Sequence, residues 1–159
     1  MSKPIELDTA AATELQPEPI PDSWILGGSP MARSKKFARS NDFTAYLMVW
    51  DCSPGKFNWH YSKDEWLVVV SGEVFISNGN GAERRLGPGD WGFFPAGTSA
   101  LWRVTSHLRK VAIVRETLPR PLGLALRLWR GGLRKLGISG KSPLLLTILM
   151  NSELLGGFQ

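Results

Sequence analysis

The chain has 159 residues, of which 43% are hydrophobic and 21% charged, and its formal net charge is +5 at pH 7. A chain of this length fits a single globular domain that buries most of its apolar surface. The only cysteine, Cys52, excludes an intramolecular disulfide and a zinc site made of several cysteines, and we expect it to behave as a small buried hydrophobic residue.

Targeting signals are the next feature to consider. Residues 1–22 lack the central apolar run of a secretory signal, and they carry five acidic residues. The longest nearly apolar run, which begins at Pro143, is much shorter than the ~20 residues needed to cross a bilayer. We therefore expect a cytoplasmic protein in a reducing compartment.

The positive charge is concentrated near the C-terminus. Residues 1–117 carry 13 basic and 13 acidic side chains, whereas residues 118–159 carry six basic side chains against one acidic side chain, which gives the whole +5. This distribution favours a local role, such as contact with an anionic partner or a membrane surface, or simply solubility. It does not indicate a nucleic-acid-binding protein.

Short strands dominate the middle of the chain. Residues 1–22 read as a flexible arm, and 24–42 as an irregular lead-in. Strands with Gly- and Pro-containing turns between them are then predicted at 43–50, 56–61, 65–71, 73–77, 91–94, 99–105 and 109–116. This pattern predicts an all-β antiparallel sandwich or barrel over residues 23–118, and the lack of βαβ alternation excludes a parallel nucleotide-binding sheet.

Residues 119–159 form a separate basic and apolar extension with helical spacing. Its apolar positions are Leu122, Ala125, Leu126, Trp129, Leu133 and Leu136, with Arg127, Arg130 and Arg134 opposite them. Gly131 and Gly132 are expected to break or kink this helix. The helix could pack on the barrel or on a second subunit, or lie at a membrane surface through residues 120–136.

Two sequence motifs resemble those of a known family. Glu65, followed by six residues and Gly72, resembles the end of the first cupin motif, and "GDWGFFPAG" (89–97) resembles the second. Together with "DCSPGKFNWHYSKDE", "SGEV", "LGPGDWGFFPAGTSALWRV" and "RKVAIVR", they resemble the ureidoglycine aminohydrolase-type and ethanolamine-utilisation-type cupins over residues 24–117. The resemblance implies a conical antiparallel jelly-roll barrel, followed here by the C-terminal helical extension.

The same resemblance implies where a metal would bind. The two histidines and the glutamate of the first motif fall on Asn58, His60 and Glu65, and the histidine of the second motif falls on Ala100. Ala100 has no donor atom and Asn58 offers only a weak neutral oxygen, so too few ligands remain for tight binding of a transition metal. We predict no cofactor. The alternative is a metal-dependent Mn or Zn enzyme of the aminohydrolase type, in which His60, Glu65, Asn58 and water hold the ion weakly.

Alternation along the strands predicts a ligand cavity inside the barrel. Residues expected to face inward are Asn58 and His60 together, Glu65, Leu67 and Val69, Ala100 and Trp102, and either Phe93 or Trp91. An apolar pocket with a few polar groups at one end is typical of a small-molecule site. If the domain is catalytic, we expect Glu65 to act as acid or base, His60 as its partner, and Trp102 as a wall of the pocket.

Several of these residues also have a purely structural interpretation. Glu65 and His60 could be an ion pair that fixes two strands, and Trp102 could belong to the core. Asp90 is expected to close a turn, while His107 is expected in a turn and Arg109-Lys110 on the surface at a strand start.

The sequence thus favours a cupin that binds a small polar or carboxylate metabolite through a degenerate metal site, as an accessory enzyme of nitrogen-compound metabolism. A second alternative is a non-enzymatic sensor or scaffold, dimerised or attached to a membrane by its C-terminal segment. A homodimer is expected by analogy with similar cupins, and a nucleic-acid partner is not.

Overall fold

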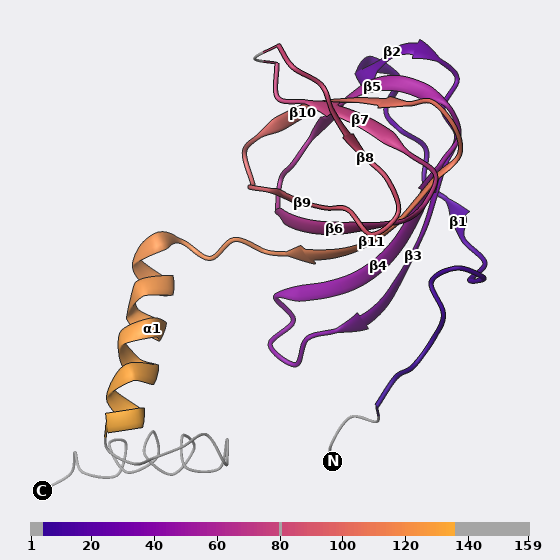
Figure 1. Cartoon of the computed structure of the whole chain (residues 1–159). Coiled ribbons are helices and arrows are strands. Elements are labelled where there is room, and N and C mark those ends of the chain that lie inside the picture. Colours follow the sequence, from indigo (N-terminus) through magenta and orange to yellow (C-terminus); the bar gives the residue numbers. More distant parts are fainter. Residues whose placement is uncertain (1–4, 80, 136–159) are drawn as a thin grey trace, which may run out of the picture. The chain divides into compact units, whose positions relative to one another are not determined.

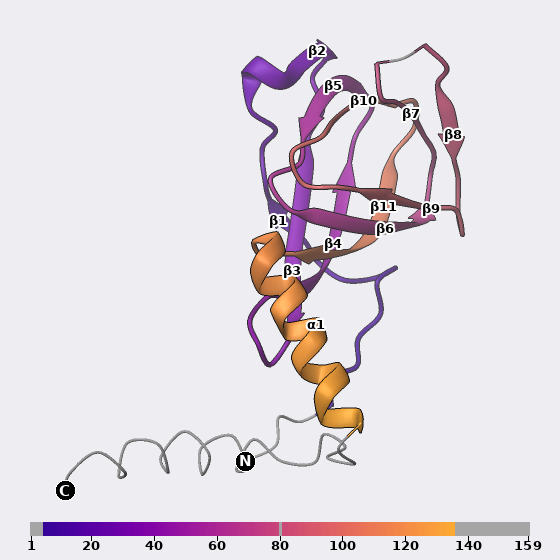
Figure 2. The ribbon, with the colours of Figure 1, turned by 90° about the vertical axis from the view of Figure 1, so that its left-hand side faces the viewer.

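The fold consists of two antiparallel β-sheets that curve around a common interior (Figure 1, Figure 2). The computed structural model describes residues 5–79 and 81–135. The six-stranded sheet has the order β1-β3-β4-β11-β6-β9, and the five-stranded sheet the order β2-β5-β10-β7-β8. The strands are β1 (Gln16–Pro17), β2 (Ile25–Gly28), β3 (Ala32–Arg39), β4 (Ala45–Cys52), β5 (Gly55–His60), β6 (Asp64–Ser71), β7 (Val74–Ser77), β8 (Arg84–Leu86), β9 (Trp91–Phe94), β10 (Ser99–Val104) and β11 (Leu108–Arg115). The predicted all-β jelly-roll fold is confirmed.

The core lies between the inner faces of the two sheets. Inward positions alternate with outward ones, as in β10, where Ala100, Trp102 and Val104 are buried. Trp102 stacks on Phe57 of the neighbouring strand, with ring centroids 6.1 Å apart and planes at 16°. Cys52 is fully buried, as predicted, and burial raises the pKa of its thiol to about 12.

The N-terminal part contains more structure than its composition predicts. The expectation of an irregular lead-in over 24–42 is wrong, because β2 and β3 lie within it and β3 pairs with β4 along most of its length. In β3, Ala32, Ser34 and Lys36 pair with the inward residues of β4. Because basic residues occur on both faces of β3, its sequence does not show a clear alternation of apolar and polar residues. Figure 2 shows β3 and β4 as long neighbouring strands.

The arm that precedes β1 is attached to the sheet through Arg109. The guanidinium of Arg109 donates to the carbonyl oxygen of Ala10 at 2.7 Å and to that of Thr13, and it also contacts the carboxylate of Asp51 at 3.1 Å. Asp51 is 1% exposed and also accepts two hydrogen bonds from Arg33, at 3.0 and 2.8 Å. Arg109 therefore ties the arm to β4 and β11, rather than decorating the surface.

The chain divides after Thr117 into two units, and the described part of the second unit comprises residues 118–135. Within its described part, α1 spans Arg120–Lys135 and continues through Gly131 and Gly132, so the expected break at these glycines is wrong. Leu136, the last apolar position of the predicted helix, lies outside the described residues. Over the described part of the chain, no helix has the length and apolar character needed to span a bilayer.

Candidate ligand site

A cavity of about 210 Å³ lies among β4, β5, β6 and β11. Its walls are largely aromatic: Trp24, Tyr46, Trp50, Trp59 and Tyr61. Charged side chains also line it: Glu18, Lys63, Glu65 and Lys110, with His60 beside them. Of the residues predicted to line a cavity in the barrel, Glu65 and His60 line this one, whereas Glu18, Lys63 and Lys110 were not expected there.

The central feature of the cavity is a buried ion pair between Glu65 of β6 and Lys110 of β11. The ammonium of Lys110 lies 2.5 Å from Oε1 of Glu65, and the two residues are only 3% and 7% exposed respectively. The pairing of β11 with β6, in which Val114 faces Glu65 and Lys110 faces Val69, brings both side chains to the inner face of the sheet. Two opposite charges removed from water are tolerated only when each compensates the other.

Three indole rings surround the Lys110 ammonium. Its nitrogen lies 4.8 Å from the ring centroid of Trp102, 4.9 Å from that of Trp50 and 5.9 Å from that of Trp59. The negative face of an indole attracts a cation within about 6 Å, and more strongly when water is excluded. The Lys110 amine therefore lies between one carboxylate and three indole rings inside the barrel.

Three residues that line the cavity carry hydrogen-bond donors that the described residues do not fully satisfy. The indole N–H of Trp50 is buried and has no partner among the described residues. Tyr61 accepts a hydrogen bond from the indole N–H of Trp102 at 3.0 Å, and burial raises the pKa of its phenol well above 10.0, so it keeps its own O–H as a donor. Lys110 has three N–H donors, of which the structure pairs one with Glu65.

Several predicted pocket residues do face the barrel interior. Glu65, Leu67, Val69, Ala100 and Trp102 are all buried, as predicted from their alternation. Among them, Glu65 lines the cavity, and Trp102 contacts both Lys110 and Tyr61. Leu67, Val69 and Ala100 belong to the hydrophobic core.

The predicted inward orientation of Asn58 and His60 is wrong. In β5 it is Phe57 and Trp59 that pack into the core, opposite Trp102 and Ala100 of β10. A one-residue change of parity moves every side chain of a strand to the other face. In "FNWHY" the apolar residues Phe57, Trp59 and Tyr61 share one parity, so the alternation itself indicated the inner face. The prediction instead followed the family motif, which places ligand positions on Asn58 and His60.

His60 instead lies at the rim of the cavity. It is exposed, and its Nδ1 lies 2.7 Å from the hydroxyl oxygen of Ser99. Its ring meets the indole of Trp24 edge to face, with centroids 4.8 Å apart. His60 and Glu65 thus line the same cavity, but the hydrogen-bonding partner of Glu65 is Lys110.

The expectation that Phe93 or Trp91 lines this cavity is also wrong. Phe93 is 44% exposed and stacks on Trp66 on the outside of the sheet, with centroids 4.7 Å apart, and Trp91 is 70% exposed. The inward aromatic residue of β9 is Phe94, which stacks on Tyr61 at 4.7 Å. In β9, the adjacent Phe93 and Phe94 made the inward parity ambiguous in the sequence.

Lys110 is a residue of the cavity lining that the sequence interpretation missed. Its assignment to the surface at a strand start is wrong, because it occupies a buried position of β11 between Leu108 and Ala112. The signal was present, since Leu108, Lys110, Ala112 and Val114 share one face of the strand. A lysine within an otherwise apolar row requires a buried anion, and Glu65 is the carboxylate on the adjacent strand.

Asp90, in contrast, closes its turn as predicted by accepting the N–H of Gly87 at 2.9 Å.

The side chains do not fit the metal ion that many cupins hold. Glu65 is occupied by Lys110, Ala100 offers no donor, and Asn58 points out of the barrel. Across residues 5–79 and 81–135, no group of three or more His, Cys, Asp or Glu side chains could hold an ion. The cation beside Glu65 is a lysine ammonium.

Comparisons with known proteins agree with this fold. The EutQ-like cupin domain model matches residues 39–112, and no curated protein matches the chain. A DUF861 family protein of unknown function from Pseudomonas syringae pv. tomato is 26% identical with a TM-score of 0.60, over 65% of this chain and 45% of that one. This chain therefore spans less than half the length of that relative.

Two further solved structures match parts of this chain. The cupin domain of Cnp3 from Schizosaccharomyces pombe is 8% identical with a TM-score of 0.52, over 69% of this chain and 68% of that one. The EutQ protein of Clostridium difficile is 18% identical with a TM-score of 0.49, over 55% of this chain and 70% of that one. The match to the EutQ-like cupin domain model covers residues 39–112, within the barrel, and the likeness to the structures from Pseudomonas syringae and Schizosaccharomyces pombe is one of fold.

Proposed function

We propose that the barrel cavity binds a small metabolite through a carboxylate group, without a metal ion. The observation that carries this proposal is the unpartnered indole N–H of Trp50, a residue that lines the same cavity as Lys110 and Tyr61. A carboxylate has two oxygens and about four acceptor positions. It is therefore the small functional group best suited to satisfy several such donors at once.

The size and walls of the cavity favour a compact ligand. A volume of about 210 Å³ corresponds to about seven water molecules at ~30 Å³ each. Trp24 and Trp59 meet edge to face, with centroids 5.5 Å apart, and provide apolar surface at one side. Glu18 and Lys63 bring one charge of each sign to the lining, so an amino or amide group on the ligand can also be accommodated.

Lys110 would supply the positive charge that a metal supplies in metal-binding cupins. An ammonium attracts a carboxylate and donates hydrogen bonds to it, but it leaves no open coordination position. For catalysis, we propose that the Glu65–Lys110 pair, rather than Glu65 with His60, transfers protons to the bound metabolite. The EutQ-like family favours a substrate of nitrogen-compound metabolism.

A ligand panel tests this proposal on the full chain. Thermal unfolding and titration calorimetry would compare acetate, malonate, glycine and other small carboxylates with the corresponding amides. We expect at least one carboxylate to raise the melting temperature while its amide does not. Equal effects of the acid and amide members throughout the panel would contradict recognition of a carboxylate.

Variants locate the binding site. Trp50→Phe removes the unpartnered N–H but keeps an aromatic ring, and it should weaken binding of the stabilising carboxylate at least fivefold. Trp66→Phe is the matched control, because Trp66 lies on the outside of β6, 37% exposed. Unchanged affinity in Trp50→Phe would exclude this cavity as the carboxylate site.

A further inference from the structure

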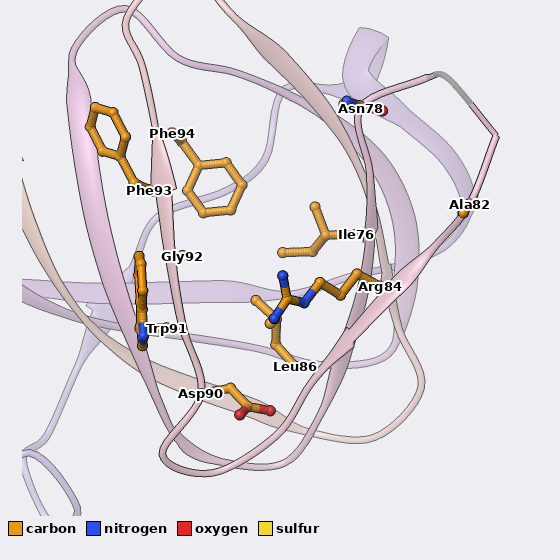
Figure 3. Close-up of a pocket in the computed structure, with 10 residues that line it drawn as sticks. All are labelled: Ile76, Asn78, Ala82, Arg84, Leu86, Asp90, Trp91, Gly92, Phe93 and Phe94. Carbon is orange, nitrogen blue, oxygen red and sulfur yellow. The ribbon is translucent and has the colours of Figure 1, made fainter.

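We propose that a second cleft, between β8 and β9, binds an amphipathic organic anion. The cleft has a volume of about 510 Å³ and lies where the two sheets separate (Figure 3). β8 is the last strand of one sheet and β9 the last strand of the other, so no described strand covers either one on this side. One wall carries Ile76, Arg84 and Leu86, and the other Gly92 and Phe94.

Arg84 supplies the charge that would recognise an anion. It pairs with Ile76, which in turn pairs with the buried Trp102, so Arg84 lies on the inner face of its sheet. Figure 3 shows its guanidinium in the space between β8 and β9. No hydrogen bond or ion pair joins Arg84 to the other described residues, and the nearby carboxylate of Asp90 accepts the N–H of Gly87 instead.

Apolar side chains line part of the cleft that contains this guanidinium. Ile76, Leu86 and the ring of Phe94 all line the cleft, and Leu86 is buried. A planar guanidinium binds a carboxylate or sulfonate through two parallel hydrogen bonds. An isolated cation next to an apolar wall therefore favours a ligand with an anionic head and an aromatic or aliphatic body.

Gly92 keeps the cleft open. A Cβ atom at this position would lie 2.8 Å from Cε2 of Phe94 and 3.8 Å from Cδ1 of Leu86. Since Gly92 pairs with the buried Leu67, its missing side chain would point into the barrel and occupy the cleft. The glycine is thus a second feature, independent of Arg84, that creates space at the site.

The cleft is separate from the carboxylate site described above. The two linings share no residue. Phe94, which lines the cleft, stacks on Tyr61, which lines the other cavity, with ring centroids 4.7 Å apart. These two rings lie between the cleft and the cavity, so ligand binding to the cleft can be tested separately from binding to the cavity.

An inward charge on an edge strand can also serve to prevent edge-to-edge aggregation. That role requires neither an open apolar cleft nor a glycine opposite the charge. The two interpretations predict different effects of removing the charge, because aggregation would change in one case and anion affinity in the other.

Two fluorescent probes distinguish anion binding from protection against aggregation. We expect the anionic probe 1-anilinonaphthalene-8-sulfonate to bind the full-length protein, and Arg84→Gln to weaken its affinity at least fivefold. The uncharged probe N-phenyl-1-naphthylamine should bind both proteins equally. Arg85→Gln is the matched control, since the adjacent Arg85 is exposed and paired with Glu73, and its affinity should equal that of the wild type.

A second variant tests the space rather than the charge. Gly92→Val fills the cleft and should weaken binding of both probes, with circular dichroism confirming that the barrel is folded. If Arg84→Gln binds the anionic probe within twofold of Arg85→Gln, the proposal is wrong. That comparison remains decisive even if Gly92→Val does not fold.

Discussion

The ammonium of Lys110 lies 2.5 Å from the carboxylate of Glu65 inside the barrel, at the position where the family motif places a metal-binding glutamate. Both charges are almost fully removed from water, and three indole rings face the ammonium. This relationship makes the stability of the barrel depend on the pair and leaves Glu65 unsuited to bind a metal.

Replacing Lys110 with Met should destabilise the protein strongly. The carboxylate of Glu65 would remain buried without its cation, and loss of one partner from a buried pair typically costs about 3–5 kcal/mol. The measurement is the free energy of unfolding from urea titration. The double variant Lys110→Met/Glu65→Leu should recover most of the loss, because it removes both charges together.

Arg85→Gln provides the comparison for this prediction. It breaks an exposed ion pair with Glu73, for which about 0–1 kcal/mol is expected. A Lys110→Met protein no less stable than Arg85→Gln would show that the buried pair contributes little to folding.

Alkaline pH should lower stability well before general denaturation. Burial raises the pKa of Cys52 from 9.0 to about 12 and raises that of Tyr61 well above 10.0. Between pH 9 and 12 the unfolded chain therefore releases protons that the folded chain retains, so the free energy of unfolding falls as pH rises. The slope should reach about 1.4 kcal/mol per pH unit for each such group.

Unfolding titrations of the wild type and Cys52→Ala from pH 8 to 11 check this. The alanine variant should lose less stability above pH 9 than the wild type does. Parallel curves for the two proteins would contradict a neutral buried thiol. In the folded protein, Cys52 should also react very slowly with a thiol reagent at pH 8.

Divalent metals should have no specific effect on the barrel. Because Glu65 is paired and Asn58 and Ala100 provide no suitable donors, Mn²⁺, Zn²⁺ and EDTA should leave the melting temperature within experimental error. Elemental analysis of protein purified without chelator is the direct measurement. One equivalent of a transition metal per chain, lost in Glu65→Gln, would overturn the interpretation of this site.

The homodimer expected from the sequence remains a proposal, for which the outer face of the six-stranded sheet gives support. Leu47, Ile113, Trp66 and Phe93 pair across four adjacent strands, and each is at least 36% exposed. Such an apolar row is unusual on a surface that remains in water. Trp66→Lys should convert the dimer to a monomer in light scattering, whereas Asn58→Lys, on the outer face of the other sheet, should not.

Membrane contact through residues 120–136 is likewise a proposal. Leu122, Leu128 and Trp129 of α1 are 49–67% exposed, and Arg127 is exposed on the same helix. At an anionic surface one basic residue contributes about 1 kcal/mol, so Arg127→Gln should weaken binding to phosphatidylglycerol vesicles about fivefold. Arg115→Gln, outside the helix, is the control, and equal sedimentation of both variants with vesicles would contradict this role for α1.

The sequence by itself determined the class of fold. Gly- and Pro-rich turns between short alternating segments predicted the antiparallel barrel, and Glu65 with Gly72 and the 89–97 motif indicated the cupin family. These signals are local, because turn geometry and strand period depend on residues close together in the chain. The inward positions of Glu65, Leu67 and Trp102 followed from the same alternation.

Only the tertiary structure decided which groups meet inside the barrel. Lys110 and Glu65 are 45 residues apart in sequence, and their contact depends on the pairing of β11 with β6. In β9, large aromatic residues stand at both parities, so packing against neighbouring strands decided that Phe94 rather than Phe93 faces the core. In β5, the apolar residues Phe57 and Trp59 share the inner face, and the motif-based assignment of His60 to that face was wrong. The alternation of apolar and polar residues in a strand can be read from that strand alone. The strand that it pairs with, and the residues that it meets across the barrel, depend on the whole sheet.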